Sequence, residues 1–272
     1  MSEECNHHCE GCSQNCDHRI EKVKPNEYSS IKKVIGVISG KGGVGKSLVS
    51  SLIASELAKK GHRVALLDAD ITGPSIPKSF GIKEKAFGDN NLIYPAISEL
   101  GIQIMSSNLL LENEEDPILW RGPLIGDLVK QFYTDVFWKD VDYMVVDMPP
   151  GTGDVALTTF QYIPVDGIVI VTTPQDLVGT IVKKAIVMAR QMDIKILGLV
   201  ENMSYVECPK CQEKIYIYGE SKIEELLKQY DVKLLARLPI RREISLAVDE
   251  GQVESISAEE ELKEVIEAIK RV

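Results

Sequence analysis

The sequence lacks any apolar run near the roughly 18 residues that a membrane-spanning helix needs, and it shows no secretory leader. It also lacks an excess of positive charge, because its formal net charge at pH 7 is −10. Such an acidic chain does not favour a broad footprint on a phosphate backbone or on anionic lipid. Internal repeats and low-complexity segments are absent too. We therefore expect a cytoplasmic protein whose partners include neither nucleic acid nor a membrane.

The first 30 residues are poor in apolar side chains. Besides cysteine, the apolar residues there are Met1, Ile20, Val23 and Tyr28. Four side chains cannot bury enough surface to offset the entropy of ordering the segment. The same segment carries four of the six cysteines, at Cys5, Cys9, Cys12 and Cys16. We predict that residues 1–30 form a flexible metal-binding tail, and that residues 31–272 form one domain.

That domain is expected to have an α/β fold. With 44% hydrophobic residues, a chain of 272 residues can bury one large core. Strands are predicted at 34–38, 63–67, 102–105, 143–147, 167–172, 196–200 and 233–238. Helices are predicted near 47–60, 123–138, 154–162, 176–192, 221–230 and 258–270. This alternation predicts a mostly parallel sheet with helices on both faces, and active-site groups at the carboxyl ends of its strands.

The octapeptide G-K-G-G-V-G-K-S at residues 40–47 matches the phosphate-loop pattern. It follows a predicted strand and opens a predicted helix, so its backbone N–H groups can cradle a polyphosphate. Lys46 would neutralise the terminal phosphates, and the Ser47 hydroxyl would ligate Mg²⁺. The predicted phosphate-site residues are Gly40, Lys41, Gly42, Gly43, Val44, Gly45, Lys46, Ser47 and Leu48.

A second lysine in this loop, Lys41, is not needed for phosphate binding by its own subunit. The pattern K-G-G-x-G-K-S resembles the deviant phosphate loop of the MinD, ParA, ArsA and nitrogenase iron protein class. In that class, dimers sandwich two nucleotides face to face. The resemblance implies that Lys41 acts on the nucleotide of a partner subunit, as an arginine finger does. A solvated loop lysine is the alternative.

Three aspartates follow predicted strands at the edge where the phosphate loop lies. Asp68 and Asp70 come directly after strand 63–67, and Asp147 ends strand 143–147. A carboxylate that closes a buried apolar strand is typical of the Walker B position in the Mg²⁺ shell. Single aspartates after strands are also common helix caps. Together with a phosphate loop, the three predict a Mg²⁺–nucleotide site.

The nucleotide base has two candidate contacts. Asn202 follows strand 196–200 and could read an adenine edge, while Pro239 follows the strand near 233–238 and could lie against the ring. A guanine-specific Asn/Thr-Lys-x-Asp motif is absent, which favours ATP. A capping role is the alternative for Asn202.

Five segments together resemble the Mrp/Nbp group, the ApbC-like iron–sulfur cluster carrier ATPases. These segments are D-A-D-I-T-G-P-S-I-P at 68–77, W-R-G-P at 120–123, D-M-P-P-G-T-G-D at 147–154, E-N-M-S at 201–204 and C-P-K-C at 208–211. The resemblance implies slow Mg²⁺-dependent ATP hydrolysis and a homodimer that carries a labile [4Fe–4S] cluster to apo-proteins. It further implies that Asp70 positions the attacking water, that Asp68 and Asp147 belong to the Mg²⁺ shell, and that Cys208 and Cys211 ligate the cluster.

Ligand counting also bears on Cys208 and Cys211. Two thiolates cannot complete a tetrahedral or cubane site, whereas a two-fold dimer supplies four. Half of a zinc ribbon and a redox dithiol remain alternatives for this pair. The tail could close a site alone, either a [4Fe–4S] cluster or zinc, with His7, His8 or His18 as further ligands.

Two other classes share this kind of phosphate loop. A MinD/ParA-like positioning ATPase would favour a basic amphipathic C-terminus or a basic face, whereas residues 258–264 read A-E-E-E-L-K-E. An electron-transferring ATPase like the nitrogenase iron protein also bridges a cluster, but its cysteines lie far apart in sequence. Both remain alternatives to the carrier.

Overall fold

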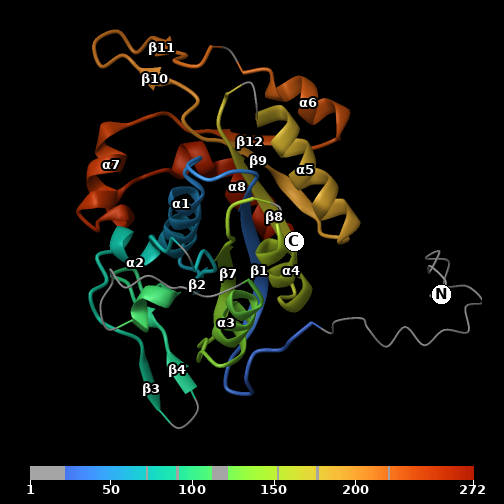
Figure 1. Cartoon of the computed structure of the whole chain (residues 1–272). Helices are drawn as coiled ribbons and strands as arrows, with labels where there is room; N and C mark the ends of the chain where they lie inside the picture. The colour runs from blue at the N-terminus through green and yellow to red at the C-terminus, as the bar shows by residue number, and fades with distance from the viewer. Residues whose placement is uncertain are drawn as a thin grey trace, which may run out of the picture.

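The computed structural model describes residues 22–71, 73–89, 92–111, 122–151, 153–175, 178–219 and 221–272. Strands and helices alternate along these ranges, as Figure 1 shows. The strands are β1 (Ile31–Ser39), β2 (Val64–Asp68), β3 (Phe87–Asp89), β4 (Leu92–Tyr94), β5 (Ala96–Ile97), β6 (Gln103–Met105), β7 (Val141–Asp147), β8 (Gly167–Thr172), β9 (Ile196–Glu201), β10 (Val206–Glu207), β11 (Lys214–Ile215) and β12 (Leu234–Arg237). The helices are α1 (Lys46–Lys59), α2 (Ile76–Ser79), α3 (Gly122–Thr134), α4 (Asp154–Tyr162), α5 (Val178–Gln191), α6 (Ile223–Gln229), α7 (Arg242–Asp249) and α8 (Glu259–Lys270), with 3₁₀ turns η1 (Ser107–Leu109) and η2 (Val253–Ser255).

The central sheet has eight strands in the order β12-β9-β8-β1-β7-β2-β6-β5. All neighbours are parallel except β5, which pairs antiparallel with β6 at one edge. Strands β1, β7 and β2 are adjacent in the middle of the sheet, and their carboxyl ends lead to the phosphate loop, Asp147 and Asp68. The predicted mostly parallel α/β sheet is confirmed.

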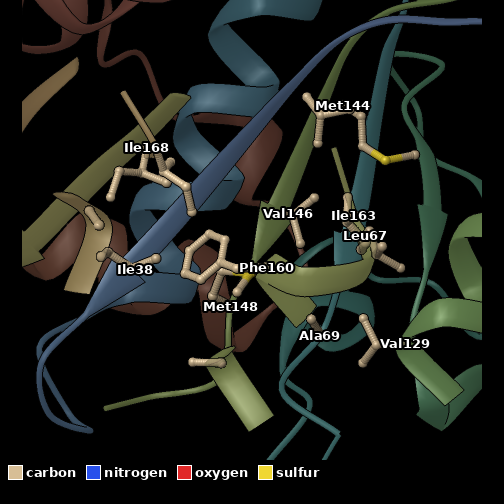
Figure 2. Close-up of a cluster of buried hydrophobic side chains, with 14 of the residues drawn as sticks. Ile38, Leu67, Ala69, Val129, Met144, Val146, Met148, Phe160, Ile163 and Ile168 are labelled. Atoms are coloured by element: carbon tan, nitrogen blue, oxygen red, sulfur yellow. The ribbon is translucent and has the colours of Figure 1, made fainter. Parts of the chain in front are cut away.

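Apolar side chains bury both faces of the sheet. One face packs against α3, α4, α5 and α6, and Figure 2 shows part of that core around Phe160, Met148 and Val146. The opposite face packs against α1, α2 and α8. No helix in the described ranges is long and apolar enough to cross a membrane. Covered on both faces, the sheet exposes functional groups mainly along its strand ends.

One expectation about local structure was wrong, and one helix was missed. The helix predicted at 123–138 ends at Thr134, because the next residues join a strand-like contact with β4. There Ile93 N–H donates to the Asp135 carbonyl at 3.0 Å, and Phe137 N–H donates to the Ile93 carbonyl at 2.8 Å. Helix α7, which follows Pro239 closely, was not predicted.

Residues 22–30, assigned from sequence to the tail, lie against the domain instead. The Asn26 side chain donates to the carbonyls of Thr134 and Val136, at 2.9 and 2.8 Å. The backbone N–H of Val23 donates to the Tyr162 carbonyl at 2.9 Å. Hydrogen bonds to exposed helix ends hold this segment although it has few apolar residues. The four tail cysteines lie outside the described residues.

Candidate nucleotide and metal sites

The phosphate loop joins β1 to α1 and is held in place by a residue from a distant strand. Gly45 has a left-handed φ of 79° at the start of α1. A Cβ at Gly45 would lie 2.2 Å from Nδ2 of Asn202, so only glycine fits there. The same Nδ2 donates to the Val44 carbonyl at 2.9 Å. Contacts within the protein therefore hold the loop backbone in place.

Asp147 contacts three side chains from the first turn and a half of α1, one through an ion pair and two through hydrogen bonds. Its Oδ2 lies 2.8 Å from Nζ of Lys46 and accepts from the Ser47 hydroxyl at 2.6 Å. Its Oδ1 accepts from the Ser50 hydroxyl at 2.7 Å. Ser50 was not singled out from sequence, although its i+3 spacing from Ser47 places both on one helix face. These contacts join the predicted Walker B carboxylate to the predicted phosphate and Mg²⁺ ligands.

Asp68 lies beside Asp147, because the two are register partners on β2 and β7. It is buried, and it accepts from the backbone N–H of Asp70 and from the Ser106 hydroxyl, both at 3.1 Å. Burial, and then the charge of Asp147, raise the pKa of Asp68 to about 8. Ser106 follows β6 at the same sheet edge. The rule that functional groups gather at the carboxyl ends of parallel strands, which identified the aspartates, could have identified Ser106 too.

A cavity of about 340 Å³ opens in front of these groups. Its lining includes Ser39, Gly42, Gly43, Gly45, Lys46, Ser47, Leu48, Asp70, Gly73, Ser75, Ser79, Pro150 and Val248. The phosphate-loop glycines, Lys46 and Asp70 thus line one cavity. A polyphosphate placed among the loop amides would meet donors, as the sequence predicted.

The charges around this cavity fit a divalent cation. Asp68 and Asp147 are 1% and 0% exposed, and Lys46 is the one buried ammonium that pairs with them among the described residues. When both carboxylates are ionised, their two charges exceed the single charge of Lys46, and a hard cation with oxygen ligands would neutralise the excess. The Ser47 hydroxyl at Asp147 adds the kind of oxygen that Mg²⁺ takes at phosphate loops.

Lys41 points away from its own phosphate site. Its Nζ donates to Oε1 of Gln175, in the segment after β8, at 2.5 Å, and it is not part of the cavity lining. That Lys41 does not serve the nucleotide of its own subunit stays a prediction, and so does its action on a partner subunit.

The two residues predicted to touch the base lie on adjacent strand ends. Asn202 is 3% exposed, and its amide group supports the phosphate loop. Pro239 is buried just after β12. Their contact with a base stays a prediction, but Asn202 has the further, unpredicted role of bracing Val44.

Cys208 and Cys211 lie on a turn beside the small β10–β11 hairpin, which extends from the body in Figure 1. Both thiols are free, and Cys211 is exposed. Hydrogen bonds from the backbone N–H groups of Cys211 and Lys210 lower the pKa of the Cys208 thiol. The thiolate is the metal-binding form of cysteine. The described residues contain no group of three or more cysteine, histidine or acidic side chains able to hold a metal ion.

The cysteine-bearing segment is bonded to the chain that carries Pro239. Ser204 N–H donates to the Leu238 carbonyl at 2.9 Å, and Ile240 N–H donates to the Tyr205 carbonyl at 2.8 Å. A cavity of about 440 Å³ separates the cysteines from the start of α7. Its lining comprises Val206, Glu207, Cys208, Pro209, Gln212, Ile240, Arg241, Arg242 and Glu243. The segment that leads to the cysteines is therefore hydrogen-bonded through its backbone to the two neighbours of Pro239, the predicted base contact.

Comparison with known proteins gives concordant results. The family model described as ParA, NUBPL iron-transfer P-loop NTPase, matches residues 30–272. An iron-sulfur cluster carrier protein from Clostridium perfringens is 44% identical over 92% of this chain and 91% of its own. Another with the same name, from Methanococcus maripaludis, is 38% identical over 99% and 98%.

Solved structures agree on the fold. A nucleotide-binding protein from Archaeoglobus fulgidus, in complex with ADP and with cobalt, is 43% identical, with a TM-score of 0.74 over 82% of this chain and 88% of that one. The cell division ATPase MinD from Pyrococcus furiosus has a TM-score of 0.62 over 88% and 98%, at 19% identity. The latter likeness concerns the fold alone.

Proposed function

Because the chain belongs to the NUBPL iron-transfer P-loop NTPase family, we propose that it is an ATP-dependent iron–sulfur cluster carrier. It would bind a labile [4Fe–4S] cluster across a cytoplasmic homodimer and transfer it to apo-proteins. The observation that carries this proposal is the cysteine turn itself: two free thiols, one with a lowered pKa, on a segment bonded to the nucleotide edge. Relatives named iron-sulfur cluster carrier proteins support it.

The nucleotide part of the proposal is slow, Mg²⁺-dependent hydrolysis of ATP. Ser47, Asp68 and Asp147 would hold Mg²⁺, which supplies charge neutralisation for the phosphates. Lys46 and the loop amides would bind those phosphates. Asp70, at the edge of the same cavity, would orient the attacking water, and Lys41 of a partner subunit would stabilise charge on the transferred phosphoryl group.

The cluster part depends on counting ligands. Cys208 and Cys211 have no third metal ligand beside them in the described ranges, whereas a cubane cluster wants four thiolates. Two chains related by a two-fold axis would supply four at one site. Cys211 is exposed, so a bridging cluster would remain open to exchange with a client. The tail cysteines would hold a second cluster or zinc.

The test uses full-length protein in which Cys5, Cys9, Cys12 and Cys16 are serine, so that iron on the tail is not counted. After anaerobic reconstitution, it should contain about four iron and four sulfide per dimer. It should also reactivate an apo-enzyme of the aconitase type. Further replacement of Cys208 or Cys211 by alanine should abolish both properties.

Zinc in place of iron, or iron retained after both cysteines are removed, would contradict the carrier. A protein without a cluster but with nucleotide-dependent dimerisation would favour the positioning-ATPase alternative. A stable cluster that is reduced and reoxidised without transfer would favour the electron-transfer alternative.

A further inference from the structure

Glu201 is a buried carboxylate fixed at the end of a central strand. It ends β9, and it is the register partner of Thr172 on β8 and of Arg237 on β12. Its carbonyl accepts from Leu238 N–H at 2.9 Å, and its side chain is 0% exposed. With a strand paired on each side, its backbone has little freedom to move.

The Glu201 side chain contacts both ends of the segment that carries the cysteines. Oε2 accepts from the Ser204 hydroxyl at 2.7 Å, where that segment begins. Oε1 accepts from the Ser221 hydroxyl, where the segment returns to α6. Ser221 in turn accepts from Ile223 N–H at 3.3 Å, in the first turn of that helix. One carboxylate therefore joins two points that are 17 residues apart in sequence.

The charge of Glu201 has a single cationic partner among the described residues. Nε of Arg237 lies 3.1 Å from Oε2, while the other end of the same guanidinium pairs with Glu224 on the surface at 2.9 Å. A buried carboxylate with one ion pair and two hydroxyl donors is well satisfied. A neutral amide in its place could not accept all three contacts.

The anchor point is also fixed relative to the nucleotide site. Asn202, the next residue, donates through its backbone N–H to Thr172 at 2.8 Å and through its side chain to Val44 in the phosphate loop. Adjacent residues thus contact the phosphate loop and both ends of the cysteine segment. Nothing in the nucleotide chemistry uses the Glu201 carboxylate, so its contacts need another explanation.

We propose that Glu201 is a positioning residue, which holds both ends of segment 204–221 at the end of β9 and so fixes Cys208 and Cys211 relative to the nucleotide site. Its importance for a cluster rests on the proposed function, but its effect on the segment does not. The direct measurement is amide hydrogen exchange along segment 204–221 in the full-length, cluster-free protein.

Glu201→Gln should speed exchange on both flanks of the segment by about tenfold, because buried donors lose their charged acceptor. Ser204→Ala should affect mainly the first flank and Ser221→Ala mainly the second. Glu224→Gln is the matched control: it removes the surface partner of Arg237 and leaves the three contacts of Glu201 intact, so exchange should not change. Exchange in β1 and β7 should stay as in the wild type.

A second readout uses cluster-loaded protein with the tail cysteines replaced by serine. Cluster loss, followed by visible absorption, should be several-fold faster in Glu201→Gln and in Ser221→Ala than in Glu224→Gln. If Glu201→Gln exchanges like Glu224→Gln, or if β1 and β7 open as much as the segment, the positioning role is wrong. If the wild type holds no cluster while the exchange pattern is as expected, the proposed function fails and the positioning role stands.

Discussion

The Nζ of Lys46 lies 2.8 Å from Oδ2 of Asp147, and both side chains are buried. The phosphate-loop lysine is therefore the internal counterion of the Asp147 carboxylate. A bound polyphosphate would replace Asp147 as the ionic partner of Lys46, and a bound Mg²⁺ would replace Lys46 as the ionic partner of Asp147. Binding then exchanges ionic partners within a site that is already charged.

Lys46→Ala should weaken Mg·ATP binding by at least about 100-fold, because it removes a buried charge contact. It should also lower the free energy of unfolding of the nucleotide-free protein by about 3 kcal/mol, since Asp147 is left buried without its cation. Lys41→Ala is the control. Its contact with Gln175 is exposed, so its effect on the free energy of unfolding should stay within about 0.5 kcal/mol. Titration calorimetry and denaturant unfolding measure the two effects; equal stability of both variants would contradict the ion-pair role.

Asp70→Ala should retain nucleotide affinity and lose turnover by about 100-fold or more, because it removes a group that orients water and leaves the phosphate contacts in place. Steady-state phosphate release and nucleotide titration separate the two quantities. Asp127→Ala, on an exposed position of α3, is the control and should hydrolyse ATP at the wild-type rate. Wild-type turnover in Asp70→Ala would remove Asp70 from the mechanism.

If Lys41 acts on the nucleotide of the partner subunit, Lys41→Ala and Lys46→Ala homodimers should each be inactive, and mixing them should restore activity. An equal mixture should reach about a quarter of wild-type turnover, because half of the dimers are mixed and each of these has one complete site. The rate is measured after mixing over a range of ratios. Activity that never exceeds that of the separate variants would show that Lys41 acts within its own chain or not at all.

The raised pKa of Asp68 predicts a pH dependence. Without Mg²⁺, the folded protein keeps a proton on Asp68 up to about pH 8, whereas the unfolded chain releases it near pH 3.8. The folded state therefore binds more protons between these values, so this group's contribution to the free energy of unfolding is present below pH 3.8 and is lost as pH rises through about 8. Asp68→Asn should flatten this dependence in denaturant unfolding measured across that range. Unchanged pH dependence in the variant would assign the effect to another group.

The same proton should affect Mg²⁺. Binding of the cation favours the ionised carboxylate, so Mg·ADP binding near neutral pH should release a proton that Asp68→Asn does not release. Calorimetry in two buffers with different ionisation enthalpies measures that proton. Equal proton release by wild type and variant would exclude Asp68 as its source.

Sequence reasoning succeeded where one local pattern determines the structure. The strands β1, β7, β8 and β9 could be predicted from the apolar composition of their segments alone. The rule that functional groups follow the carboxyl ends of parallel strands predicted that Asp68 and Asp147 lie side by side. The phosphate loop was recognisable because its glycines and Lys46 follow a fixed spacing.

Sequence reasoning failed where distant contacts decide. The helix before β7 stopped at Thr134 because Asn26 and Ile93, both far away in the chain, bind the residues that follow. The predicted contact of Asn202 with a base stays a prediction, but no sequence pattern signalled that its side chain would also hydrogen-bond to Val44, 158 residues away in the chain. The segment 22–30 docks through polar contacts to helix ends, which an apolar count does not detect.

The contacts of Glu201 join both ends of segment 204–221 at the end of β9, so that this segment forms a closed loop beside the sheet edge. Lengthening this loop would cost little additional closure entropy. It would not displace β9 or α6, because these elements lie outside the loop and pack in the body of the domain. The length of the cysteine-bearing loop can therefore change without altering the fold of the nucleotide-binding body. If the proposed function holds, replacing this loop with another of similar end spacing should change which metal group the protein carries.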